Sequence, residues 1–399
     1  MKSSSKLLIS LLACLPLCLL GGCWSSVELN DRAFARILVL DYHDTGIELT
    51  LGFPLPSRLS AGKAGSSAGG QSTKPFTFIT KTGKDIGQAY RKIQADLPRE
   101  ITLGQLRSIV ISKKFAQKGI KPFADFLARE PAIHINGNLF VMNGTAKQLA
   151  DISTTFEKFP SDILSDFSEE NESISMTIKD MLMAIFNGGD MVMPILVFGE
   201  AGDESDSKGN NWLRAGGAAI FKQGKMVSTL NTKESRGALW ILGQTKEAEF
   251  NVSSPTDGKT VSFYVQHAST KIKPIINGKQ ISFLITCKAN ANLLSTESTM
   301  DLTVQKDMKL LEQRLADKLK GRIGQAFAKS KTAESDVFQL GNYIKWRYPQ
   351  KWKVIKKDWR AYFSAKVRVD TKIEMVMKWT GAVQNPEWNR LLPDKEAAK

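Results

Sequence analysis

The chain has 399 residues, which is enough for two or three domains, and its 42% hydrophobic and 24% charged content is ordinary for a folded soluble protein. Three of its four cysteines lie within the first 23 residues, so an intramolecular disulfide framework is excluded once Cys23 is acylated. The formal net charge of +15 favours anionic partners, which include lipid headgroups, wall polymers, nucleic acid and acidic proteins.

Residues 1–22 have the layout of a secretory signal peptide, with a short basic start, an apolar stretch from Leu7 to Leu20 and small residues after it. The stretch is too short for a transmembrane helix. The sequence Leu20-Gly21-Gly22-Cys23 resembles the bacterial lipobox, although Gly21 replaces the commoner Ala or Ser. We therefore predict that residues 1–22 are removed and that Cys23 carries a diacylglyceryl anchor, in which two acyl chains give stable attachment.

Residues 23–200 alternate β-rich runs with amphipathic stretches, which predicts an N-terminal α/β domain. The expected strands are 33–40, 46–53, 106–111 and 133–142, and the expected helices are 83–97 and 121–129. A Gly-, Ser- and Ala-rich run at 60–73 indicates a surface loop. The acidic, polar residues 201–211 then indicate a linker.

Residues 212–258 are predicted to form a small middle domain, and residues 259–399 a C-terminal α/β domain. In the middle segment, 216–221 and 226–230 flank a Gln-Gly-Lys turn and indicate a hairpin, and the turn-rich run 253–258 suggests a boundary.

The C-terminal segment has the clearest patterns. Asn277-Gly278 suits a type I′ hairpin turn. Apolar residues step by three and four from Val304 to Phe327, which predicts an amphipathic helix packed on a sheet; a coiled-coil seam is less favoured because the pattern stops at Phe327. Residues 367–377 alternate and predict a half-buried antiparallel strand. The fold class expected is α+β, with three mixed α/β domains and antiparallel sheets.

No catalytic or metal-binding pattern is evident, so we predict no enzyme activity, no metal and no cofactor. His43, His134 and His267 lie far apart and lack paired ligand spacing. The sequence contains no G-x-S-x-G elbow, P-loop or dinucleotide fingerprint. Cys287 lies in an alternating apolar run, which favours a buried hydrophobic residue over a reactive thiol.

Residues 345–360 interleave basic and aromatic side chains, and three interpretations remain open. The segment could bind single-stranded nucleic acid, which an exported protein rarely meets. It could instead form two short helices around Pro349 with buried indoles, or a surface for a partner or a membrane. The candidate partner or membrane contacts are Trp24, Glu28, Trp346, Lys351 and Trp352.

In chain order, several further motifs resemble the Ger(x)C family, the C-subunit lipoproteins of bacterial spore germinant receptors. They are Cys23-Trp24 with Glu28-Leu29-Asn30, Arg107–Ser112 with Gly119-Ile120 and Phe126–Arg129, Gly217–Lys222 with Gly224–Val227 and Leu230, and Asp336-Val337-Phe338 with Leu340-Gly341, Pro349, Trp352, Trp359 and a strand ending near Gly381. Ser25 departs from the Asp usual in the family's opening. The resemblance covers nearly the whole chain after the leader.

The resemblance implies a three-domain lipoprotein on the outer face of the inner spore membrane. It implies two integral membrane subunits as partners in a nutrient receptor, a non-catalytic role in germination, and no nucleic acid; the receptor complex would bind the small-molecule germinant. The alternative is a solute-binding lipoprotein of a transporter, and a membrane-held cell-wall enzyme is the third hypothesis. Tight binding of a small solute by the protein alone would favour the alternative, and release of wall fragments would favour the third.

Overall fold

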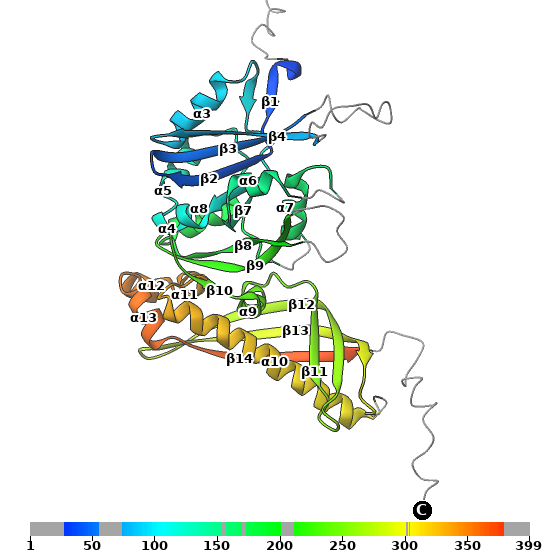
Figure 1. Ribbon diagram of the computed structural model, residues 1–399. Coiled ribbons are helices and arrows are strands. Elements are labelled where there is room, and N and C mark those ends of the chain that lie inside the picture. Colours follow the sequence, from blue (N-terminus) through cyan, green and yellow to red (C-terminus); the bar gives the residue numbers. More distant parts are fainter. Residues whose placement is uncertain are drawn as a thin grey trace, which may run out of the picture.

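The computed structural model describes residues 28–55, 74–152, 157–169, 173–200, 211–300, 302 and 304–378. An N-terminal body built on an eight-stranded sheet lies against a C-terminal body in which a long helix crosses a four-stranded sheet (Figure 1). Cys23, Trp24, the predicted loop 60–73 and nearly all of the predicted linker lie outside the described residues. The α+β class predicted from the sequence is confirmed.

The large sheet has a parallel centre and antiparallel edges. Its strands follow the order β10-β9-β8-β7-β6-β2-β3-β4. The four strands β8, β7, β6 and β2 pair in parallel, and an antiparallel pair extends each side. The bounds are β2 Ile37–His43, β3 Gly46–Pro54, β4 Phe76–Gly83, β6 Ser108–Ser112, β7 Asn138–Asn143, β8 Met191–Glu200, β9 Asn211–Lys222 and β10 Lys225–Leu230.

Helices cover both faces of this sheet. Since neighbouring residues of a strand point to opposite faces, each central strand contributes side chains to two cores. Leu38 and Leu40 of β2 enter one core, and Ile37 and Val39 enter the other. The first core also contains side chains of α3 Ile86–Ala95, α4 Lys113–Lys118, α5 Lys121–Arg129 and α8 Ile178–Phe186; the second contains those of α6 Ala146–Ala150 and α7 Pro160–Glu169. A small parallel pair, β1 Arg32–Phe34 with β5 Glu100–Thr102, follows the short 3-10 helix η1 Leu29–Asp31.

Side-chain caps fix where several of these helices begin. The Asp85 carboxylate accepts a hydrogen bond from the Gln88 backbone N–H at 2.7 Å and starts α3. Thr177 and Asn231 start α8 and α9 Thr232–Leu242 with capping boxes, each closed by an acid three residues later. Such caps satisfy backbone N–H groups that have no partner inside the helix.

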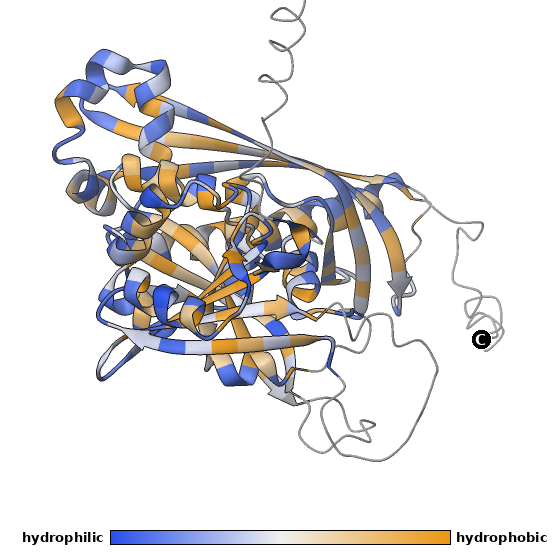
Figure 2. Cartoon of the chain, turned by 90° about the horizontal axis from the view of Figure 1, so that it is seen from above, coloured by the Kyte–Doolittle hydropathy of each residue, from blue (hydrophilic) through white to orange (hydrophobic). Residues whose placement is uncertain are grey.

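The C-terminal sheet has the order β11-β12-β13-β14. Its strands are β11 Ala248–Ser253, β12 Thr260–Asn277, β13 Gln280–Thr296 and β14 Arg368–Lys378, and its helices besides α9 are α10 Gln305–Thr332, α11 Leu340–Arg347, α12 Pro349–Ile355 and α13 Trp359–Lys366. The predicted hairpin between β12 and β13 is confirmed, but the type I′ turn at Asn277-Gly278 is not. Asn277 pairs with Gln280, so Gly278 and Lys279 form the turn, and of these only Gly278 has positive φ. Along these strands, hydrophobic and hydrophilic residues alternate (Figure 2).

The predicted amphipathic helix is confirmed and extends to Thr332. Leu311, Leu315, Leu319 and Ile323 are fully buried and belong to the same core as the inward-facing residues of β12 and β13. These side chains repeat every four residues, so they form one stripe on the helix that packs on the sheet.

The prediction of an antiparallel strand at 367–377 is wrong, because β14 pairs with β13 in parallel. The chain returns from β13 to β14 through α10, α11, α12 and α13, and a long helical crossover brings the second strand back in the same direction. The alternation of polar and apolar residues reports the face of a strand and not its direction.

The segment 212–258, predicted as a small middle domain, divides its elements between the two sheets. The predicted hairpin is confirmed as β9 and β10, which complete the edge of the eight-stranded sheet. Helix α9 follows, and β11 forms the edge of the C-terminal sheet. The domain boundaries themselves stay a prediction.

Candidate functional site

The described residues offer no metal centre, since no three or more of their His, Cys, Asp and Glu side chains group closely enough to hold an ion. Within the same ranges, no helix combines the length and apolar character needed to cross a membrane. Cys287 is fully buried, as predicted, and burial raises the pKa of its thiol. The buried charged groups with the most hydrogen-bond partners lie instead at the junction where the C-terminal helices meet the N-terminal body.

Asp190 forms the centre of this junction. Its carboxylate is 8% exposed and binds the Arg360 guanidinium through two hydrogen bonds, Nη2 to Oδ1 at 2.8 Å and Nε to Oδ2 at 3.1 Å. The backbone N–H groups of Gln223 and Asp336 also donate to it, each at 3.1 Å. One buried acid just before β8 therefore fixes the β9–β10 turn and two segments of the C-terminal body.

Asp336 forms a second buried acid beside the first. Its carboxylate accepts hydrogen bonds from the backbone N–H groups of Leu340 and Gly341 and from the Trp359 indole N–H, at 2.8–2.9 Å. Burial, helped by the nearby Asp190 charge, raises the pKa of Asp336 to about 6 against the lowering effect of these three donors. The acid thus anchors the start of α11 to the start of α13.

Gly341 is required where two indoles pack against α11. A Cβ at this position would lie 2.7 Å from the Trp352 ring and 2.8 Å from the Trp359 ring nitrogen. The two indole rings meet edge to face at 5.6 Å, and Trp359 also packs edge to face on Phe283 of β13 at 6.4 Å. Trp352 and Trp359 therefore support the fold of the C-terminal body.

Three non-glycine residues at the same junction have strained backbone conformations. Gln223, Glu334 and Gln339 have φ between 52° and 54°, the left-handed region that side chains other than glycine rarely adopt. The Lys222 ammonium binds the Glu334 carboxylate at 2.6 Å, and the Ser335 hydroxyl donates to the Phe221 carbonyl at 2.6 Å. The junction is thus held in one arrangement by contacts from both bodies.

An apolar ridge lies exposed beside the junction. Leu182, Met183 and Phe186 occupy one side of α8, and Phe186 is 79% exposed. The Lys345 ammonium of α11 lies 5.4 Å from the centre of the Phe186 ring. Trp346, the next residue, is 69% exposed. We call Leu182, Met183, Phe186 and Trp346 the exposed apolar surface.

The structure separates the residues predicted as contacts. Trp346 and Lys351 are exposed, whereas Trp352 is half-buried against Trp359. Glu28 is exposed at the start of the described chain, and β1, which follows soon after it, lies at the other end of the N-terminal body from α11 and α12 (Figure 1). The predicted pair of short helices around Pro349 is confirmed as α11 and α12. Whether any of these residues contacts a partner stays a prediction.

Three features of this region are not predicted from the sequence: Asp190, Arg360 and the apolar ridge on α8. Asp190 and Arg360 are 170 positions apart, so no local pattern joins them. The α8 ridge had a usable signal, because Leu182, Met183 and Phe186 fall on the side opposite to the buried residues Ile178, Met181 and Ala184.

Two families of known sequences match this chain. The family described as "Spore germination protein N-terminal domain" matches residues 25–198, and "Spore germination B3/ GerAC like, C-terminal" matches residues 216–378. Among curated proteins, the chain is 25% identical to "Spore germination protein KC" of Bacillus subtilis (strain 168), over 96% of this chain and 97% of that protein. It is also 25% identical to "Spore germination protein B3" of the same organism, over 91% and 95%.

A relative from Bacillus cereus, "Spore germination protein GerQC", is 25% identical over 78% of this chain and 85% of its own length. Among solved structures, "Crystal Structure of the GerBC protein" superposes with a TM-score of 0.54 at 20% identity. That match covers 88% of this chain and 98% of the other, and it shows a shared fold.

Proposed function

Because the chain belongs to the GerAC-like family of spore germination proteins, we propose that it is a lipid-anchored subunit of a nutrient germinant receptor. In this proposal the subunit lies on the outer face of the inner spore membrane, attached through Cys23. It acts without catalysis, by binding two integral membrane subunits of the receptor.

The order of the matched segments carries the proposal. The two family domains follow each other at 25–198 and 216–378, directly behind a leader that ends in Leu20-Gly21-Gly22-Cys23. In this proposal the predicted signal peptide directs the folded part across the membrane, and the predicted lipid on Cys23 holds it at the surface. Proteins held in this way can work by contact with membrane neighbours.

The exposed apolar surface supports the proposal that the membrane component bound by this chain is a protein. Exposed aromatic side chains that are surrounded by charge are typical of contact sites, where they carry much of the binding energy. The α11–α12 segment beside Trp346 is strongly basic, with Lys345, Arg347, Lys351 and Lys353. We therefore propose that an acidic, extracytoplasmic segment of an integral membrane subunit occupies this surface.

Replacing Cys23 with alanine is expected to move the protein from the membrane fraction to the soluble fraction of spores. Each buried CH₂ of an acyl chain contributes about 0.8 kcal/mol, so loss of both chains removes the anchor. The measurement is a pull-down of the full-length chain from spore membranes, with identification of the proteins that co-purify. Polytopic subunits should be recovered with the wild type and lost with Cys23→Ala.

Cys18→Ala is the matched control, because Cys18 lies in the predicted leader and should leave the anchor intact. Retention of the Cys23→Ala protein on the membrane would contradict the anchor. Recovery of a transporter permease and ATPase with the wild type would favour a solute-binding lipoprotein instead.

Replacing Phe186 and Trp346 with alanine is expected to lower recovery of the membrane subunits by at least ~10-fold, since central aromatic contacts contribute about 2 kcal/mol each. The free energy of unfolding should fall by no more than about 2 kcal/mol, because both side chains are exposed. Phe186 loses its contact with Lys345, and Trp346 loses its edge-to-face contact with Tyr343. The measurements are quantitative pull-down and chemical denaturation.

Trp212→Ala serves as the control, because Trp212 of β9 is another exposed indole outside the exposed apolar surface. Equal loss of partners with Trp212→Ala, or full recovery with the double variant, would count against this surface as the contact site.

A further inference from the structure

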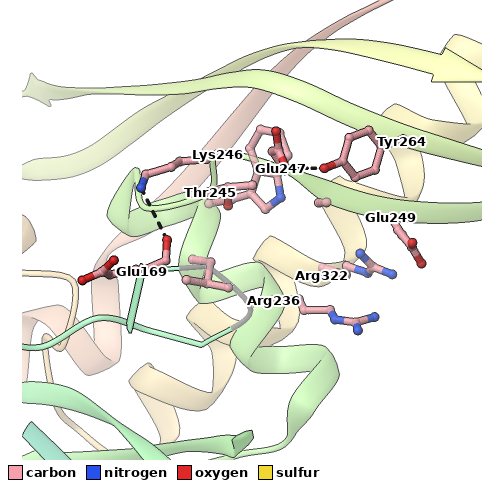
Figure 3. Close-up of a pocket in the computed structure, with 11 residues that line it drawn as sticks. Glu169, Arg236, Thr245, Lys246, Glu247, Glu249, Tyr264 and Arg322 are labelled. Carbon is pink, nitrogen blue, oxygen red and sulfur yellow. Dashed lines mark hydrogen bonds between the residues drawn. The ribbon is translucent and has the colours of Figure 1, made fainter. Parts of the chain in front are cut away.

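A cavity of about 580 Å³ lies where the end of α7 meets α9, α10 and the first two strands of the C-terminal sheet (Figure 3). Its volume is in the range of sites that hold small molecules. It is separate from the junction at Asp190 and from the exposed apolar surface. Its lining combines a few apolar side chains, such as Leu239 and Trp240, with charged groups of both signs.

Two arginines form one wall of this cavity. Arg236 comes from α9 and Arg322 from α10, and Figure 3 shows their guanidinium groups projecting in the same direction. In the described ranges, no carboxylate oxygen lies within 4.0 Å of a guanidinium nitrogen of either arginine, so neither forms an ion pair there. Arg322 is half-buried, with its guanidinium carbon 4.4 Å from the centre of the Phe250 ring. Burial and the neighbouring Arg236 charge lower the pKa of Arg322, so an anion between the two would relieve their repulsion.

A close helix contact holds the two arginines together. Gly237 follows Arg236 on α9, and a Cβ there would lie 2.1 Å from the Arg322 carbonyl oxygen of α10. The two helix backbones therefore touch at this point. The contact fixes the backbone positions from which the two side chains extend, which removes part of the entropic cost of binding, although Arg236 itself is exposed and Arg322 half-buried.

Acids and hydroxyls also line the cavity. Glu247 and Glu249 lie at the start of β11, and the Glu247 carboxylate accepts a hydrogen bond from the Tyr264 hydroxyl. Thr245 also lines the cavity and is only 7% exposed, yet its hydroxyl finds no hydrogen-bond partner in the described part of the chain. An unpaired buried hydroxyl is rare in folded proteins, but this oxygen has almost no accessible surface, so it is not a contact for a ligand as the side chains stand.

We propose that this cavity binds a small organic anion, with its phosphate or carboxylate group held by Arg236 and Arg322. Guanidinium groups bind both oxyanions through paired hydrogen bonds. The other end of the ligand carries a hydrogen-bond donor or an ammonium group that faces Glu247 and Glu249. This site goes beyond the proposed contact with membrane subunits and does not depend on it.

The test is isothermal titration calorimetry of the full-length chain in neutral detergent with inorganic phosphate, acetate and phosphoethanolamine. Saturable one-to-one binding is expected for at least one oxyanion, and phosphate and acetate separate the two oxyanion chemistries. In this proposal phosphoethanolamine should bind more tightly than phosphate, because its ammonium group adds a contact with Glu247 or Glu249, which line the same cavity. Arg236→Gln and Arg322→Gln should each weaken binding by at least ~10-fold, the loss of one charge-assisted contact.

Arg314→Gln is the matched control, since Arg314 is an exposed arginine of the same helix as Arg322 but does not line the cavity. Arg322→Gln also removes the contact with Phe250, so Arg236→Gln is the deciding variant. The proposal is overturned by no saturable binding of any probe, by unchanged binding in Arg236→Gln, or by equal weakening in Arg314→Gln. Weaker binding of phosphoethanolamine than of phosphate would overturn the two-ended ligand.

Discussion

Gly237→Ala is expected to lower the free energy of unfolding by about 2 kcal/mol, even though alanine favours a helix over glycine by about 1 kcal/mol. The added Cβ would meet the Arg322 carbonyl oxygen at 2.1 Å, its carbonyl carbon at 2.5 Å and the Ile323 nitrogen at 3.0 Å. All three are backbone atoms of α10, so no side chain can move aside. The helices must separate, and overpacking of this kind costs about 3 kcal/mol.

Gly321→Ala and Gly324→Ala on α10 are matched controls for this prediction. A Cβ at either position meets no atom within 4 Å, so only the helix preference acts. Each should raise the free energy of unfolding by up to about 1 kcal/mol. Urea denaturation of the three variants at unchanged slope compares them directly. A Gly237→Ala protein as stable as the two controls would show that α9 and α10 do not touch.

The sequence predicts best the elements whose pattern is local and regular. The helix from Val304 to Phe327 and the hairpin that joins β12 to β13 are confirmed, because periodicity and turn signals each depend on adjacent residues, although the turn falls one residue later than predicted. The alternation of residues 367–377 does not report strand direction, so the predicted antiparallel direction of β14 is wrong. The elements of 212–258 are divided between the two sheets. A local hairpin pattern therefore does not predict which sheet the hairpin joins.

The candidate sites show the same limit more strongly. The basic and aromatic segment 345–360 was identified from composition, yet only the fold sorts Trp346 to the surface and Trp359 to the core. Gly237 looks in sequence like a mildly unfavourable helix residue, because its contact with α10 lies more than 80 positions away. Arg236 and Arg322 are separated by the same interval, so no motif spacing joins them.

Arg360→Met is expected to lower the free energy of unfolding by about 3 kcal/mol, because it leaves the Asp190 carboxylate buried without its partner charge. This loss of unfolding free energy is small for a broken buried ion pair. The N–H groups of Gln223 and Asp336 still donate to the carboxylate, and Arg360 is itself 28% exposed. Chemical denaturation of the full-length chain measures the change.

Adding Asp190→Asn to Arg360→Met should recover about 1–2 kcal/mol, because the uncompensated charge is removed while an amide oxygen remains to accept a backbone hydrogen bond. Lys222→Met is the control: it breaks the Lys222–Glu334 pair, which also joins the two bodies but has a 60% exposed carboxylate. Exposed pairs contribute about 0–1 kcal/mol, so this variant should be nearly neutral. If Arg360→Met were equally neutral, the joint between the bodies would rest on apolar packing, and the buried acids would serve only to orient α11 and α13. If the full loss is observed, Asp190 couples the position of β8 to that of α13, and a partner that binds the exposed apolar surface beside it would act on both bodies at once.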